Sequence, residues 1–282
     1  MALQTAAAAA GNITLGGTLT VNRMGYGAMR LTGTGIWGDP ADRPAAGQVL
    51  HRALELGVNF IDTADAYGPE TNERLIAEYL HPYPAGMVIA TKGGLVRPGP
   101  GRFEADGRPE YLRAACDASL KRLKLDCIDV YQLHTPDRRV PFADSVGALA
   151  RLQGAGKIRH IGLSNVSLAQ LEAACEMVTV VSVQNRYSVS DRTSDDVLAY
   201  CERKGTAFIP WFPLAAGKLA NQSEGTIASV GRAQGLAPAQ VALAWLLARS
   251  PVMLPIPGTS SIAHLEENIA AAGLKLPQEA LP

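Results

Sequence analysis

The chain has 282 residues, of which 47% are hydrophobic and 18% charged, and 26 Lys plus Arg balance 26 Asp plus Glu to a formal net charge of zero. This composition supplies enough apolar surface for a large core and excludes a disordered chain. The neutral balance offers no basic face for nucleic acid or anionic lipid, so we expect neither as a partner.

The N-terminal segment and the cysteines indicate where the protein resides. The segment MALQTAAAAAGN lacks the basic part of a secretory signal, and we expect residues 1–12 to form a flexible tail. No apolar run approaches the roughly 20 residues that span a bilayer. Four cysteines (Cys116, Cys127, Cys175 and Cys201) lie far apart without metal-ligand spacing. We therefore expect a cytoplasmic protein with free thiols, no metal site and no membrane contact.

Short apolar or β-branched runs alternate with longer amphipathic stretches along the chain. The short runs predict eight strands, at 23–29, 58–62, 87–91, 127–134, 158–164, 179–184, 206–211 and 252–256. The amphipathic stretches predict eight helices, at 44–56, 71–80, 109–123, 143–155, 168–177, 194–204, 238–249 and 262–271. Eight strand-helix units in about 250 residues favour a (β/α)8 TIM barrel of the α/β class, as a single domain over 1–282. An open doubly wound sheet is the alternative.

Three other segments complete the predicted layout. ITLGGTLTVNRM has Gly-Gly between two alternating runs, which predicts an N-terminal β-hairpin that closes the bottom of the barrel. Residues 224–234 predict a small additional helix. RPGPGRFEADGRPE, which follows the third strand, predicts a long loop that is either a mobile lid or disordered.

Polar side chains stand at the carboxyl ends of successive predicted strands. Asp62 ends the second strand, Lys92 follows the third and His134 ends the fourth. The next three strands end in Ser164, Asn165, Gln184 and Trp211. In a barrel these ends converge on the face where active sites are built, so we expect one site.

Tyr67, on the loop after the second strand, adds a possible acid to this set. A phenol with a pKa near 10 is a poor acid at neutral pH unless its anion is stabilised. An ammonium about 4 Å away, at an effective dielectric of about 20, supplies roughly 4 kcal/mol, or about three pKa units. Lys92 is the available cation, and Asp62 can hold it charged. His134 can orient a substrate carbonyl or share the phenolic proton.

In order, spacing and strand placement, these four residues match the catalytic tetrad of the aldo-keto reductases, a family that the chain resembles. The matching text is DTADAYG, VIATKGG, DVYQLHTPD, RHIGLSN, VQNRYS, WFPLAAGKL and IPGTSSIAHLEENIA. The resemblance implies the same barrel and an NADP-dependent oxidoreductase that reduces an aldehyde or ketone to an alcohol by hydride transfer. Tyr67 would be the proton donor, Lys92 its activator, Asp62 the partner of Lys92, and His134 the group that orients the substrate.

The resemblance also implies which residues hold the cofactor. Ser164, Asn165 and Gln184 would bind the carboxamide of the nicotinamide, and Trp211 would stack on its ring. The other implied cofactor-binding residues lie at further loop positions around the barrel mouth: Gly27, Ala28, Met29, Asp62, Phe212, Pro213, Leu214, Gly217, Lys218, Ile256, Gly258, Thr259, Ser260, His264, Glu267 and Asn268.

Some positions depart from the family pattern and bear on specificity. His264 stands where many relatives carry an arginine against the 2′-phosphate, so NADPH is expected with NADH as the alternative. Phe212 replaces a commoner serine.

The segments VNRMGYGAMRLTG, WFPL and IPGTSSIAHLEEN resemble the branch with bacterial pyridoxal reductases, which implies pyridoxal or another aromatic aldehyde as substrate. Trp37 and Arg30 are candidates for lining that pocket.

Two further functions are consistent with the same residues. The chain could be a cofactor-sensing binding subunit of a larger assembly, or an unrelated barrel enzyme that uses Lys92 as a Schiff-base nucleophile. For the reductase we expect a small-molecule carbonyl substrate and a monomer.

Overall fold

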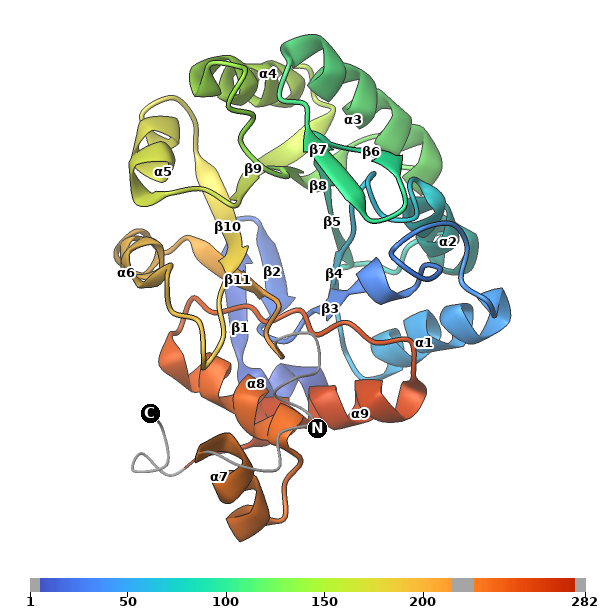
Figure 1. The fold of residues 1–282 in the computed structure, drawn as a ribbon, viewed down its shortest axis with the longest axis vertical. Helices are drawn as coiled ribbons and strands as arrows, with labels where there is room; N and C mark the ends of the chain where they lie inside the picture. Colours follow the sequence, from blue (N-terminus) through green and yellow to red (C-terminus); the bar gives the residue numbers. More distant parts are fainter. Residues whose placement is uncertain (1–5, 215–225, 277–282) are drawn as a thin grey trace.

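A computed structural model describes residues 6–214 and 226–276 of the chain. Seven parallel strands form one curved sheet, in the spatial order β11-β10-β9-β8-β5-β4-β3. The strands are β3 (Tyr26–Gly27), β4 (Phe60–Asp62), β5 (Val88–Gly93), β8 (Ile128–Leu133), β9 (Ile158–Ser164), β10 (Val180–Arg186) and β11 (Ala207–Trp211). Figure 1 shows this sheet at the centre with the helices around its outside.

The predicted eighth strand lies between β11 and β3, but it is not a regular strand. The Phe208 amide donates to the Val252 carbonyl at 2.9 Å, and the Leu254 amide donates to the Phe208 carbonyl at 2.8 Å. On the other side the Gly25 amide donates to the Pro255 carbonyl at 2.9 Å. Because prolines in and beside this segment have no amide hydrogen to donate, the ladder stops there. A few β-type hydrogen bonds therefore complete the (β/α)8 barrel.

The predicted helices are all present, and their ends lie within two residues of the predicted ones. They are α1 (Arg43–Glu55), α2 (Thr71–Leu80), α3 (Pro109–Leu123), α4 (Phe142–Gly154), α5 (Leu168–Cys175), α6 (Asp195–Lys204), α7 (Thr226–Gln234), α8 (Pro238–Arg249) and α9 (Ile262–Ala270). Local chemistry fixes several ends. Ser167 and Gln170 form a capping box at the start of α5, and Gly57, with φ of 86°, follows α1 in the left-handed conformation.

The expected N-terminal hairpin is formed by β1 (Asn12–Leu15) and β2 (Leu19–Asn22), which pair antiparallel. Leu15 and Val21 from this hairpin belong to the same buried cluster as Phe60, Val130 and Ile209 of the barrel strands. The hairpin thus closes the amino-terminal end of the barrel, which leaves the carboxyl end for chemistry.

Three sequence-based expectations differ from the structure. Residues of the supposed flexible tail form a 3-10 helix (Ala6–Ala10), in which Ala7 is buried and its amide donates to the Leu56 carbonyl at 3.0 Å. The supposed loop after β5 contains a second antiparallel hairpin, made of β6 (Leu95–Gly99) and β7 (Arg102–Ala105). The first strand is shorter than predicted, because the chain turns into a 3-10 helix at Ala28–Arg30.

The described ranges contain no helix that is both long and apolar enough to cross a membrane. All four cysteines are free thiols, two of them buried and two half-buried. The organisation as a single domain stays a prediction.

The hairpin at the bottom of the barrel gives a stability test. Leu15 is 1% exposed inside the barrel, so we expect Leu15→Ala to lower the free energy of unfolding by about 2–5 kcal/mol. Thr20→Ala, an exposed position on the same hairpin, should change it by less than about 0.5 kcal/mol. Urea denaturation of both variants measures this difference, and equal effects would show that the hairpin does not fill the barrel.

Candidate active site

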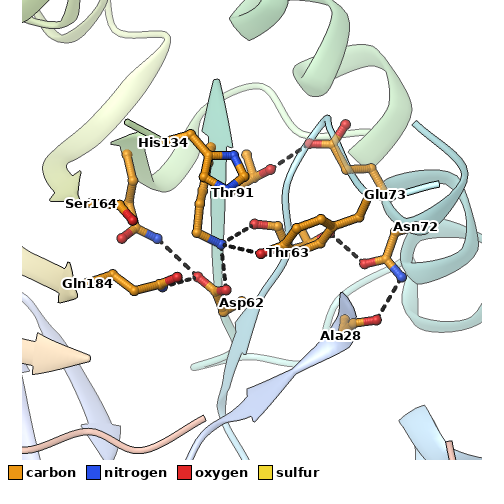
Figure 2. Close-up of polar contacts among 12 residues, drawn as sticks. Ala28, Asp62, Thr63, Asn72, Glu73, Thr91, His134, Ser164 and Gln184 are labelled. Atoms are coloured by element: carbon orange, nitrogen blue, oxygen red, sulfur yellow. Dashed lines mark hydrogen bonds and ion pairs between the residues drawn. The ribbon is translucent and has the colours of Figure 1, made fainter. Parts of the chain in front are cut away.

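The carboxyl ends of the barrel strands surround a cleft of about 930 Å³. Asp62, Tyr67 and His134 line this cleft, and Lys92 lies beneath it with none of its surface exposed. The four residues come from the ends of β4, β5 and β8 and from the loop after β4. The structure therefore brings the predicted tetrad together at one place; Figure 2 labels two of its members, Asp62 and His134.

Lys92 makes three hydrogen bonds that fix its ammonium group. Its Nζ donates to Oδ1 of Asp62 at 2.5 Å, to the carbonyl of Thr63 at 2.8 Å and to the hydroxyl of Tyr67 at 3.4 Å. In Figure 2, dashed lines mark the contacts that reach Asp62 and Thr63. An ammonium has three hydrogens, so all its donors are used and its charge faces both a carboxylate and a phenol.

Asp62 is held by more than its lysine partner. Its second oxygen, Oδ2, accepts from Nε2 of Gln132 at 3.0 Å and from Nε2 of Gln184 at 2.8 Å. Gln132 was not among the predicted residues. Gln132 lies on β8, two residues before His134, and alternate residues of a strand share one face. This spacing could have identified Gln132 as a site residue.

The environment of the ion pair sets the protonation state of Lys92. Burial acts to lower the pKa of Lys92, but the charge of Asp62, the Tyr67 phenol and the hydrogen bonds to both outweigh burial, so the pKa is raised. Lys92 is therefore an ammonium at neutral pH. A fully buried ammonium has no lone pair for attack on a carbonyl, which argues against the Schiff-base alternative.

The pKa of Tyr67 differs from the sequence-based expectation. Burial raises the pKa of the phenol, and Asp62 and Asp65 add to this, whereas Lys92 lowers it without overcoming burial. The expected acidification of Tyr67 is wrong in net direction, because the sequence did not show how completely the phenol would be buried. Tyr67 therefore holds its proton at neutral pH.

His134 is a neutral imidazole at neutral pH. Burial and the nearby charge of Lys92 keep the pKa of His134 well below its ordinary value. Its ring lies edge-on to the Tyr67 ring, with 5.9 Å between centroids and an interplanar angle of 83°. Its Nδ1 is buried and has no hydrogen-bond partner among the described residues. A neutral ring beside the phenol can orient a substrate oxygen without adding charge.

Asn165 connects three strand ends on the other side of the cleft. Its backbone amide donates to the Gln184 carbonyl at 3.0 Å, and its Nδ2 donates to the His134 carbonyl at 3.0 Å. Its Oδ1 accepts from Nε1 of Trp211 at 2.9 Å, which fixes the indole. Asn165 and Phe212 have φ of 59° and 65°, a left-handed conformation that costs free energy for a residue other than glycine and is typical of functional sites.

The cleft contains nearly all the implied cofactor-binding residues that the structure describes. Those that line it are Gly27, Met29, Asp62, Ser164, Asn165, Gln184, Trp211, Phe212, Pro213, Leu214, Ile256, Gly258, Thr259, Ser260, His264, Glu267 and Asn268. Ala28 is the exception, because it is fully buried and its carbonyl accepts from Nδ2 of Asn72 at 2.8 Å. Gly217 and Lys218 lie outside the described residues.

The polar groups and the helix start that line this cleft fit a dinucleotide, and two close backbone approaches shape it. A Cβ on Gly27 would lie 2.6 Å from the Ile256 carbonyl oxygen, and one on Gly258 would lie 2.6 Å from the Gly27 carbonyl oxygen. Only glycine allows these backbones to approach so closely. Nearby, Ser261 is the N-cap of α9, and its hydroxyl accepts from the His264 amide; such a helix start favours a phosphate.

The cleft also has an apolar region that the sequence did not indicate. Ile36, Leu95 and Phe103 line it, together with Arg30. Arg30 was a candidate for the pocket and is found there. Trp37, the other candidate, is not among the lining residues and instead lies over the guanidinium of Arg97.

Comparison with known proteins identifies the family. A family model described as the aldo/keto reductase family matches residues 23–282. The chain belongs to the aldo/keto reductase family. It is 50% identical over 264 residues to an uncharacterized oxidoreductase of Schizosaccharomyces pombe, which covers 93% of this chain and 85% of that protein. It is 43% identical over 271 residues to pyridoxine 4-dehydrogenase of Escherichia coli, which covers 94% of each chain.

The solved structures agree with this assignment. The aldo/keto reductase from Klebsiella pneumoniae in complex with NADP and acetate superimposes with a TM-score of 0.81 at 27% identity, covering 96% of this chain and 92% of that one. The predicted (β/α)8 barrel is confirmed, and the protein is an oxidoreductase of this family.

The protonation states predict a wide pH plateau. If Tyr67 donates the proton and His134 orients the substrate, reduction needs a protonated Tyr67 and a neutral His134; the pKa of Tyr67 is raised and that of His134 is well below its ordinary value. We therefore expect kcat for carbonyl reduction to fall only in alkali, as Tyr67 loses its proton, and in acid, as His134 gains one.

The measurement is kcat at saturating cofactor and substrate from acid to alkaline pH. An inflection between about pH 7 and pH 9 would contradict these assignments, because neither group titrates there.

Proposed function

We propose that the protein is an NADPH-dependent reductase that converts an aldehyde or ketone to an alcohol, with Tyr67 as the proton donor. The observation that carries the proposal is the buried Lys92 ammonium, which contacts both Asp62 and the Tyr67 hydroxyl at the floor of the cleft. Pyridoxal or another aromatic aldehyde is the candidate substrate.

The proposed reaction divides the chemistry between the cofactor and the chain. A reduced nicotinamide bound in the cleft supplies the hydride that reduces the carbonyl carbon. The Tyr67 hydroxyl gives its proton to the carbonyl oxygen, which completes the alcohol. Lys92, 3.4 Å away, stabilises the phenolate that remains, and Asp62 holds Lys92 in its charged form. Neutral His134 orients the carbonyl oxygen toward Tyr67.

The cleft supports the choice of cofactor. Trp211, fixed by Asn165, offers an aromatic face for the nicotinamide ring, and Ser164 and Gln184 offer polar groups for its carboxamide. The start of α9 and His264 would meet the 2′-phosphate of NADPH. The relative from Klebsiella pneumoniae was solved with NADP.

The comparisons support the proposed substrate class. The relative named pyridoxine 4-dehydrogenase covers 94% of this chain at 43% identity. Dehydrogenation of an alcohol is the reverse of the reduction proposed here, and the same residues serve both directions. The apolar side chains of Ile36, Leu95 and Phe103 in the cleft suit the ring of such a substrate.

We also propose that the protein is a cytoplasmic monomer that works as a single domain. The large hydrophobic side chains exposed on the described part of the chain are Phe103, Met177 and Ile262, at 37% to 47% exposure. They lie on different elements, and an obligate interface would need a contiguous apolar patch.

The first test removes the proposed proton donor. We expect Tyr67→Phe to lower kcat for pyridoxal by about 10²- to 10⁴-fold, because the phenyl ring keeps the packing but has no proton to give. NADPH binding, measured by fluorescence titration, should be nearly unchanged. Tyr111→Phe is the control: Tyr111 is a half-buried tyrosine that does not line the cleft, and its hydroxyl donates to Asp65 at 3.4 Å.

NADPH oxidation by wild type and both variants, over a panel of aldehydes and ketones that includes pyridoxal, decides the proposal. A Tyr67→Phe variant with wild-type kcat would overturn the role of Tyr67. Tight NADPH binding by the wild type with no turnover of any carbonyl, and a partner that co-purifies, would favour the cofactor-sensing subunit.

The second test concerns cofactor choice. Arginine has a full charge and a fork of donors, whereas imidazole has at most two donors, so His264→Arg should tighten NADPH binding about tenfold. Binding of NADH, which lacks the 2′-phosphate, should not change. His51→Arg, an exposed histidine outside the cleft, is the control. Equal tightening of both cofactors by His264→Arg would place His264 away from the 2′-phosphate.

A further inference from the structure

Arg97 on β6 is a buried cation bound by backbone carbonyls. Arg97 is 9% exposed, and among residues 6–214 and 226–276 its hydrogen-bond partners are backbone carbonyls and not carboxylates. Its Nε donates to the Arg102 carbonyl at 2.9 Å, which holds the two strands of the hairpin together. Its other nitrogens donate to backbone carbonyls of two separate loops, so the guanidinium links the hairpin to both loops.

The first of these loops follows β3. The guanidinium donates to the Gly35 carbonyl at 3.2 Å and to the Ile36 carbonyl at 2.9 Å. Ile36 has φ of 57°, a strained conformation for a β-branched residue. Hydrogen bonds to both carbonyls stabilise the loop in this conformation, and Ile36 lines the cleft as a result.

The second loop carries the proton donor. The guanidinium donates to the carbonyl of Ala66 at 3.0 Å, and Tyr67 is the next residue. One side chain therefore ties the loop that holds Tyr67 to the loop that holds Ile36 and to the β6–β7 hairpin, which contributes Leu95 and Phe103 to the cleft.

Two aromatic rings lie next to the same guanidinium. Its Cζ lies 3.9 Å from the centroid of the Phe103 ring and 5.5 Å from that of the Trp37 ring. Such contacts orient an aromatic ring. Phe103 nevertheless stays 43% exposed, and it lines the cleft. A fixed ring with exposed area in a cleft is a surface on which another flat ring can stack.

We propose that Arg97 is a positioning residue for substrate recognition. It fixes Ile36, Leu95 and Phe103, here called the hydrophobic wall, beside Tyr67, and this wall selects carbonyl compounds with a flat aromatic ring. The inference rests on the proposed reductase function and assigns to Arg97 the positioning that gives that site its preference for aromatic substrates. A small aliphatic aldehyde has no ring to stack, so its contacts with the wall add little binding free energy.

The experiment compares benzaldehyde with propanal in the full-length enzyme at saturating NADPH. For Arg97→Gln and for Phe103→Ala, we expect the ratio of kcat/KM for benzaldehyde to that for propanal to fall about tenfold, mainly through KM for benzaldehyde. Phe103→Tyr keeps the ring and should keep the ratio. Arg97→Lys keeps the charge but not the fork of donors, so its ratio should lie between those of the wild type and Arg97→Gln.

Two controls separate recognition from general damage. Arg102→Gln removes a cation from the same hairpin whose side chain pairs with exposed Glu104, and it should leave the ratio unchanged. The double variant Arg97→Gln/Phe103→Ala should have about the same ratio as Phe103→Ala alone, because both changes disrupt the same hydrophobic wall.

The outcomes are distinct. Equal losses for the two aldehydes in Arg97→Gln, or an unchanged ratio in Phe103→Ala, would overturn the inference while the wild type still reduces aldehydes. Oxidation of NADPH with neither aldehyde by the wild type would instead overturn the proposed function. If Arg97→Gln loses NADPH binding through misfolding, Arg97→Lys decides the role of Arg97, and the two Phe103 variants decide the role of the wall.

Discussion

The candidate site depends on one buried ion pair, between Lys92 and Asp62. Strand register creates it: Asp62 on β4 pairs with Ala90 on β5, and Lys92, two residues further along β5, faces the same side of the sheet. Lys92 in turn pairs with Gln132 on β8. Adjacent parallel strands thus deliver a carboxylate, an ammonium and an amide to one level of the barrel interior.

Such a pair is stable only if the remaining polar atoms are satisfied, because burial of charge is costly. The two oxygens of Asp62 accept from Lys92, Gln132 and Gln184, and Lys92 uses its remaining hydrogens on Thr63 and Tyr67. The ion pair therefore keeps both charges although Lys92 is fully buried and Asp62 is 2% exposed. Tyr67 is buried beside this pair and holds its proton. It can give this proton to a substrate oxygen on which negative charge develops.

Much of this arrangement follows from the sequence. Alternating apolar runs and amphipathic stretches set the order of strands and helices, and residues at strand ends converge in any parallel barrel. The expectations that were wrong share one cause: each feature depends on tertiary contacts or burial that the local sequence does not reveal. Prolines interrupt the last strand, the hairpin of β6 and β7 forms around Arg97, and the net pKa direction of Tyr67 depends on burial that no local pattern reveals. Gln132 could have been found from its spacing to His134.

The central claim is that the charge of Lys92 stabilises the phenolate left when Tyr67 gives up its proton. Stopped-flow measurement of a single turnover of bound NADPH in a Lys92→Met variant tests it directly, with cofactor affinity and thermal unfolding as checks on the fold. The account predicts a rate about 10²- to 10³-fold below that of the wild type, with NADPH affinity nearly unchanged. A well-folded variant that oxidises NADPH at the wild-type rate would contradict it.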